Sequence, residues 1–343
     1  MRCLPMQTFT EAGFSGRVGR ARRQLGFGAA TRVASGLLFA LAALSASGCK
    51  RDGESTAGAP SASAALPAPV ASGVPIPLDL VSRTVNPRGE AVYSGPAGSV
   101  RGVVTVSGDA PPEQPEVLAK IADDCAPARE VYGHLFREGE GRTLADVLVA
   151  VTGYKGYVPE QHSIVEVVGS GCAWSARTFA LTFGQRIDIV AKDRKAYVPD
   201  LLGAKMPAQL IALPGGAGST VYAQQPGRYA LVDSLRIYSM ADVLVLKYAT
   251  HDVTGLDGKF QIERIPVGRV TVSALLPATG ETVEQTIDIE PSRTAELKFV
   301  LPFDLAKYKE RIAKSAPPDR AVSAAPAPSA SNRPAPAPSA RPH

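Results

Sequence analysis

Cysteine and histidine are the residue types best suited to metal or nucleophilic chemistry, and this 343-residue chain has four of each. No histidine stands in an H-E-x-x-H or H-x-x-E arrangement, so the zinc motif of a metalloprotease is missing. The G-x-S-x-G nucleophile turn, the phosphate-binding Walker loop and the Rossmann glycine run are missing as well. We therefore expect a protein that is not an enzyme, with no catalytic residues and no cofactor.

The first 48 residues show the order of segments that is typical of a secretory signal. Several arginines precede the apolar run of 13 residues at 36–48, which is shorter than the roughly 20 residues of a membrane-spanning helix. The stretch "ASGC" at 46–49 resembles a bacterial lipobox, whose cysteine is acylated and becomes the mature N-terminus. This resemblance predicts lipidation of Cys49, with ordinary signal cleavage as the alternative, and Lys50 matches the pattern of outer-membrane sorting.

The remaining cysteines predict one disulfide bond. Cys3 leaves with the leader and Cys49 takes lipid, so Cys125 and Cys172 remain together in an oxidising compartment. A bond between them closes a loop of 46 intervening residues and contributes roughly 4 kcal/mol in the chain-entropy treatment. Two free buried thiols are the alternative. A two-thiolate metal site is disfavoured because no nearby cysteine or histidine completes a set of four ligands.

The charge of the chain changes once the leader is removed. Residues 1–48 hold six of the 37 basic side chains and one of the 32 acidic ones, so the rest of the chain carries 31 of each. No basic surface is left to attract a polyanion, and we expect no nucleic acid partner.

Both ends of the mature chain are rich in Ala, Pro and Ser, as in "GAPSASAALPAPVASG" and "SAAPAPSASNRPAPAPSARPH". Such segments have too few large apolar residues to offset the entropy of ordering. We expect a disordered tether at 49–95 and a disordered tail at 316–343. Just before the tail, "DLAKYKERIAK" predicts a short amphipathic helix within 303–315, capped by Asp304.

The middle of the chain consists of short apolar runs broken by Gly, Pro and Asp, and several runs alternate with period two. This pattern predicts an all-β protein made of two consecutive β-sandwich domains. The strands expected in the first domain are 100–108, 146–153, 163–169, 178–184, 186–193, 208–215, 227–233 and 241–250. Those expected in the second are 259–265, 268–277, 281–289 and 294–301.

The stretch "VTGLDGKFQIERIPVGRVTVSALLP" resembles the carboxypeptidase regulatory-like, transthyretin-like family. The positions that match its pattern include Gly258, Phe260, Pro266 and Gly268, and Gly255 departs where the family has Asp. The resemblance implies a transthyretin-like sandwich at 251–302. It implies no activity, because a fold does not specify a function.

Residues 96–250 resemble cupredoxin-like domains, through "VRGVVTVSGDAPP", "DDCAP", "GCAW" and "FGQRIDIVAKD". Matched to the family's C-x-x-H-x-x-M copper loop, Asp233 stands at the cysteine, Arg236 at the histidine and Met240 one place after the methionine. The upstream histidine falls on Tyr197. Blue copper needs two imidazoles and a thiolate with a weak axial thioether, and an arginine brings a fixed positive charge. We therefore expect a degenerate site without metal, in which Asp233 and Arg236 pair with each other.

These features together predict a non-catalytic cell-envelope lipoprotein. A lipid anchor would hold it at a membrane, with the outer membrane facing the periplasm or the cell surface as the expected place. Its β-sandwiches would present a binding or scaffolding surface to an envelope protein or a cell-wall polymer. The alternative is a periplasmic copper-binding, electron-transfer cupredoxin with a variant site.

Overall fold

A computed structural model describes residues 71–315 of the chain. The leader, Cys49 and the tail at 316–343 lie outside the described residues, and so does the tether up to residue 70. Within the described part, strands hold far more residues than helices do, as the all-β prediction requires. None of the helices between residues 71 and 315 is long and apolar enough to cross a membrane.

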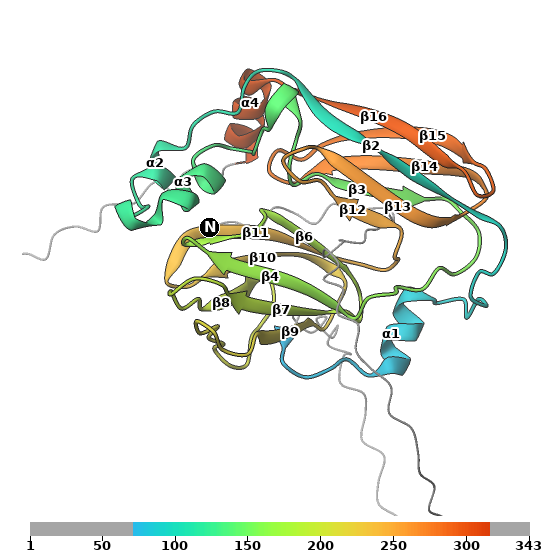
Figure 1. Cartoon of the computed structure of the whole chain (residues 1–343), viewed down its shortest axis with the longest axis horizontal. Helices are drawn as coiled ribbons and strands as arrows, with labels where there is room; N and C mark the ends of the chain where they lie inside the picture. Colours follow the sequence, from blue (N-terminus) through green and yellow to red (C-terminus); the bar gives the residue numbers. More distant parts are fainter. Residues whose placement is uncertain (1–70, 316–343) are drawn as a thin grey trace, which may run out of the picture.

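Four sheets form two β-sandwiches, stacked one above the other in Figure 1. The first sandwich pairs a sheet of order β1-β9-β7-β4-β5 with a sheet of order β6-β11-β10-β8. Its strands are β1 (Ala71–Ser72), β4 (Ile164–Ser170), β5 (Ala173–Trp174), β6 (Thr178–Thr182), β7 (Arg186–Ala191), β8 (Pro199–Leu202), β9 (Ser219–Ala223), β10 (Gly227–Asp233) and β11 (Arg236–Leu246).

The second sandwich pairs a sheet of order β12-β3-β14-β15 with a sheet of order β13-β2-β16. Its strands are β2 (Ala97–Gly108), β3 (Leu148–Thr152), β12 (His251–Val253), β13 (Lys259–Pro266), β14 (Gly268–Leu276), β15 (Glu281–Ile289) and β16 (Thr294–Phe303). The Asp-Gly turn before β13 has the expected geometry, since Gly258 has φ +66°, a value that favours glycine.

The expected domain boundary at residue 250 differs from the strand pairing. β2 and β3 precede the first sandwich in the chain, yet β2 lies between β13 and β16, and β3 lies between β12 and β14. The four strands after residue 258 therefore have no complete sheet of their own. They reach a stable size by pairing with the two earlier strands, as expected for a unit of about 50 residues that is too small to bury a core alone.

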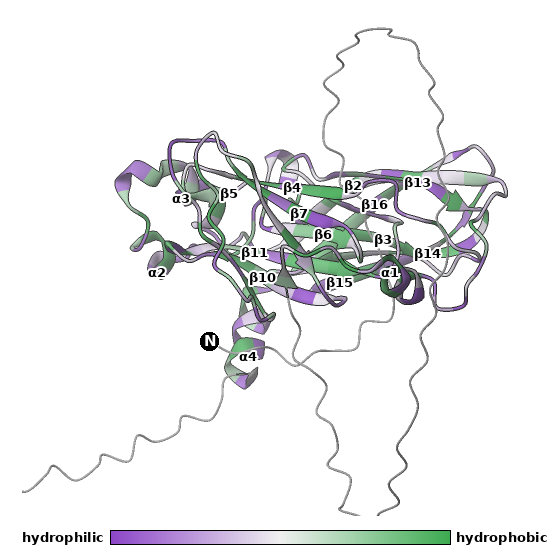
Figure 2. Cartoon of the chain, turned by 90° about the horizontal axis from the view of Figure 1, so that it is seen from below, coloured by the Kyte–Doolittle hydropathy of each residue, from purple (hydrophilic) through white to green (hydrophobic). Residues whose placement is uncertain are grey.

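The two sandwiches pack directly on each other. Leu148 of β3 and Leu275 of β14 contact Ala180 of β6 and Leu244 of β11 in one buried cluster. Because β3 and β6 are covered on both faces, their residues are buried without alternation, as their continuous apolar sequences require. Figure 2 shows hydrophobic residues concentrated on the strands in the middle of the molecule, including β3 and β6.

Part of the expected tether is folded. β1 pairs with β9 through Ala71 and Ala223, and Ile76 is buried in the core of the first sandwich. Helix α1 (Leu78–Val85) follows and packs Val81 and Val85 on the same core. The apolar area that these few residues bury against the sheet offsets the entropy cost of ordering them. The composition of the segment did not predict this burial.

The expected strand at 208–215 is also absent from the described structure. Only Ala212 and Pro214 form isolated bridges there, and Ile211 and Leu213 are exposed. Prolines at 207 and 214 remove backbone donors, so a continuous ladder cannot form through this stretch.

The helical elements lie outside the sheets, with α2 and α3 on one side of the molecule, α1 on the other and α4 at the upper end of the second sandwich (Figure 1). The helical segment between β2 and β3 was not predicted from the sequence. Besides α1, the elements are α2 (Pro115–Leu118), the 3₁₀ turn Asp123–Cys125, α3 (Ala126–Tyr132), the 3₁₀ turn Glu140–Arg142 and α4 (Leu305–Ser315). At α4, Asp304 Oδ1 accepts a hydrogen bond from the Lys307 backbone N–H at 3.0 Å.

Candidate functional site

The residues at the expected copper loop form an ion pair. Asp233 ends β10 and is fully buried, and Arg236 begins β11 after a two-residue turn. The Arg236 guanidinium donates to Asp233 Oδ2 at 2.5 Å and to the Ala196 carbonyl at 3.1 Å. Asp233 Oδ1 accepts from the backbone N–H groups of Val198 and Leu235. Every oxygen of this buried carboxylate therefore has a protein partner.

Tyr197 completes this cluster. Its ring lies under the Arg236 guanidinium, 5.0 Å from ring centroid to carbon, within the range of a cation–π contact. Its hydroxyl donates to Asp193 Oδ2 at 2.9 Å and accepts from the Cys172 backbone N–H at 3.1 Å. Burial, with the hydrogen bond to Asp193, raises the pKa of Tyr197. A Cβ at Gly169 would lie 2.8 Å from this ring, so glycine lets the tyrosine pack against β4.

The structure thus brings together three of the four positions matched to copper ligands and separates the fourth. Met240 lies further along β11, opposite Val232 in the ladder, and its side chain is 40% exposed. The cluster presents a guanidinium where a cation would have to bind. Within residues 71–315, no group of three histidine, cysteine or acidic side chains is arranged to hold a metal ion.

We expect added copper to leave the protein unchanged. Arg236 repels a cation, and both oxygens of Asp233 are already used by protein donors. Titration with Cu(II) should produce no intense thiolate-to-copper absorption and no rise in melting temperature. Stoichiometric copper that stays bound through dialysis would contradict this expectation.

The predicted disulfide is confirmed. Cys125 and Cys172 are bonded, with Cα atoms 5.4 Å apart. The bond attaches the helical segment, which contains Cys125, to the turn between β4 and β5, which contains Cys172. Both cysteines are buried. The bond thereby holds α3 against β11, so that the Tyr132 hydroxyl lies 3.1 Å from Ser239 Oγ and accepts from the Trp174 backbone N–H at 3.0 Å.

His251 of β12 lies at the contact between the two sandwiches. It is buried, with Nε2 3.2 Å from Thr182 Oγ1, and burial lowers its pKa well below the usual value. The imidazole is therefore neutral at physiological pH. This arrangement fits a packing and hydrogen-bonding role.

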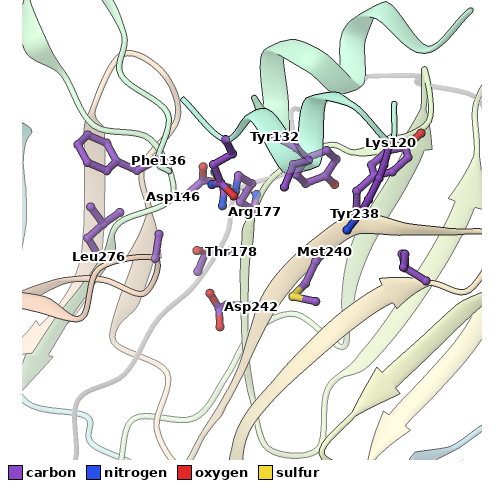
Figure 3. A pocket seen from close by; sticks show the side chains of 14 residues that line it. Lys120, Tyr132, Phe136, Asp146, Arg177, Thr178, Tyr238, Met240, Asp242 and Leu276 are labelled. Carbon is purple, nitrogen blue, oxygen red and sulfur yellow. Dashed lines mark hydrogen bonds between the residues drawn. The ribbon is translucent and has the colours of Figure 1, made fainter. Parts of the chain in front are cut away.

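A cavity of about 300 Å³ opens where α2, α3, β11 and the second sandwich meet. Figure 3 shows Arg177 and Tyr132 between Phe136 and Leu276 on one side and Lys120 and Tyr238 on the other. The further lining residues are Gln114, Val117, Asp146, Thr178, Ile237, Met240, Asp242 and Ala278. Apolar walls with a few converging polar groups are typical of small-molecule sites.

The two arginines at this junction cavity differ in their hydrogen-bond partners. Arg137 binds Asp146 with two hydrogen bonds, at 2.6 and 2.7 Å, and Asp146 Oδ1 also accepts from the Arg177 backbone N–H. Burial opposes the charge of Arg137, but its hydrogen bonds with Asp146 raise its pKa overall. Among residues 71–315, the Arg177 side chain donates only to the His134 carbonyl, at 2.8 Å, and its guanidinium carbon lies 5.9 Å from the Tyr132 ring centroid. Burial lowers the pKa of Arg177.

This cavity was not predicted from the sequence. Its lining comes from six separate stretches between residues 114 and 278, and none of them carries a motif. The backbone of one lining residue is unusual, since Asp146 has φ +65°, a value that is uncommon outside glycine. The sequence does not reveal this conformation, so it could not have identified the cavity.

No family model and no curated protein matches the chain. Among solved structures, the amicyanin of Paracoccus versutus is similar over 28% of this chain and 96% of its own, with 14% identity and a TM-score of 0.22. The copper-containing nitrite reductase of Thermus scotoductus is similar over 27% of this chain and 24% of its own, with 17% identity and a TM-score of 0.21. These similarities to cupredoxins are weak and cover a small part of the chain.

Proposed function

We propose that this protein is a non-catalytic cell-envelope lipoprotein whose two β-sandwiches present a binding surface. In this proposal Cys49 carries the lipid, the outer membrane holds the anchor, and the second sandwich is transthyretin-like. The "ASGC" stretch and the motif around "LDGKFQIERIPVG" support these parts. An envelope protein or a cell-wall polymer is the partner class that this place in the cell favours.

The observation that carries the proposal is the state of the copper-loop positions. Asp233 and Arg236 satisfy each other and the surrounding backbone, so the loop stabilises the fold and offers no open coordination position. The surface beside it is different, since Ile237 and Met240 are large apolar residues exposed at 54% and 40%. Exposed apolar residues beside a cavity are typical of a binding surface.

The anchor is tested by the variant Cys49→Ser. Without the thiol no lipid can be attached, and we expect the protein to leave the membrane fraction or to keep its leader. Labelling with a radioactive fatty acid checks this, with Cys125→Ser as the matched cysteine change that should keep the label. Undiminished labelling of Cys49→Ser would contradict the anchor.

The binding role is tested by crosslinking the lipidated protein in its own envelope and comparing the captured molecules. The double variant Ile237→Asp with Met240→Asp should lose specific partners, because two charges replace the apolar rim of the cavity. The matched control is Val300→Asp on β16, which is 51% exposed and lies outside the cavity lining. Equal capture by all three proteins would contradict a binding surface at this place.

A further inference from the structure

The junction cavity has an excess of positive charge. Its lining holds two carboxylates, and each is already bound by an arginine outside the lining, Asp146 by Arg137 and Asp242 by Arg228 at 2.8 Å. Within residues 71–315, neither the guanidinium of Arg177 nor the ammonium of Lys120, the two cationic groups of the lining, has a carboxylate oxygen within 4 Å. Two positive charges therefore face the cavity without a matching anion.

Arg177 has donors to spare for an anion. Its guanidinium uses one N–H for the His134 carbonyl and stacks near Tyr132, while a guanidinium has five N–H donors in a planar fork. That fork matches the geometry of a carboxylate with two parallel hydrogen bonds. Burial lowers the pKa of Arg177, although the charges of Asp146 and Asp242 act in the opposite direction, and an anion beside the guanidinium would further favour its charged form.

The rest of the lining sets the shape of the ligand. Phe136, Leu276 and Ala278 come from the second sandwich, and Ile237, Tyr238 and Met240 come from β11. These walls are apolar or aromatic. Tyr132 adds no charge, because burial raises its pKa to about 12 and its hydroxyl is bound to Ser239 and Trp174.

We propose that the junction cavity binds an organic monocarboxylate with an apolar body, whose carboxylate is held by Arg177 and whose body lies against Ile237, Met240 and Leu276. A volume of about 300 Å³ suits a ligand at the small end of the usual range. This inference names the ligand class for the binding role proposed above and rests on it. A free acid and the last residue of a peptide present the same chemistry, so the test includes both.

The probes are 3-phenylpropionate and a pentapeptide that ends in phenylalanine, each paired with its neutral C-terminal amide. Binding to the mature chain, residues 49–343, is measured by titration calorimetry. We expect at least one acid to bind and its amide to bind more weakly by about tenfold or more, since a charged hydrogen-bonded contact is lost. The tighter of the two acids identifies the source of the ligand.

Three variants assign the binding to the cavity. Arg177→Gln should weaken it by about 10- to 100-fold, whereas Arg269→Gln, an exposed arginine of β14 outside the lining, should leave it unchanged. Ile237→Ala should weaken it by about 3- to 10-fold through lost apolar contact. Because Ile237 is 54% exposed, Ile237→Ala should fold normally. This variant therefore tests the cavity even if Arg177→Gln fails to fold.

Several outcomes would overturn the proposal. They are no binding of either acid, equal binding of acid and amide, or equal effects of Arg177→Gln and Arg269→Gln. Failure here is distinguishable from failure of the binding role. If an envelope partner is crosslinked to the unmodified protein but not to the double variant Ile237→Asp with Met240→Asp, the binding surface is supported. In that case, failure of the acids to bind contradicts only the carboxylate ligand.

Discussion

Asp233→Ala is expected to destabilise the protein by about 3–5 kcal/mol, the usual effect of removing one partner of a buried ion pair. Asp233 is fully buried, and the side chain of Arg236 is only 17% exposed. The variant leaves the guanidinium without a counter-charge. It also removes the acceptor for the Val198 and Leu235 backbone N–H groups. Urea unfolding followed by tryptophan fluorescence measures the loss, because the single tryptophan, Trp174, lies in the same sandwich.

Two comparisons identify the cause of this loss. Asp79→Ala removes the acid of an exposed ion pair, whose partners are 70% and 73% exposed, and should change stability little. The double variant Asp233→Leu with Arg236→Met replaces both charges by apolar groups and should recover at least half of the loss. A loss below about 1 kcal/mol in Asp233→Ala would show that the pair contributes little to the fold.

Removing the disulfide is expected to lower the stability by about 4 kcal/mol, from the entropy of a 47-residue separation in the unfolded chain. The variant is Cys125→Ser with Cys172→Ser. Since the bond attaches the helical segment to the β4–β5 turn, its loss should also loosen α3, including Tyr132 in the cavity wall. Hydrogen exchange of residues 126–132, together with urea unfolding, provides the measurement.

Reductant supplies the control for the disulfide. Reducing the unmodified protein should lower its stability to that of the double serine variant, and the same treatment should not change the variant. If the two reduced proteins differ by more than about 1 kcal/mol, the serine substitutions act through packing and the predicted entropy term is too large.

Several features of this protein followed from local sequence alone. Strand positions such as β7 and β10 were predictable because alternation and turn residues act within a few positions along the chain. The Cys125–Cys172 bond was predictable from the expectation of export, which leaves these two cysteines together in an oxidising compartment. The pairing of Asp233 with Arg236 was also predictable, since an aspartate and an arginine three residues apart at a strand end can reach each other.

The tertiary structure decided which strands form one sandwich. β2 and β3 have the same local pattern as the strands of the first sandwich, and nothing in that pattern names their partners. Their pairing with β13, β14 and β16 depends on which edges are open after the chain has turned back. Likewise, Ala71 and Ile76 fold only because β9 and the core of the first sandwich are there to receive them.

The junction cavity is the clearest case of a feature beyond the sequence. Lys120, Arg177 and Ile237 are distant in the chain, and no motif surrounds any of them in the sequence. Only the packing of two sandwiches and a disulfide-held helix puts them around one space. Whether an arginine forms an ion pair depends on which carboxylates lie close to it in the folded chain. The two carboxylates of the cavity lining, Asp146 and Asp242, are paired with Arg137 and Arg228. Sequence sets the type of each charge, whereas the distances between charges are set by the long-range packing of the chain.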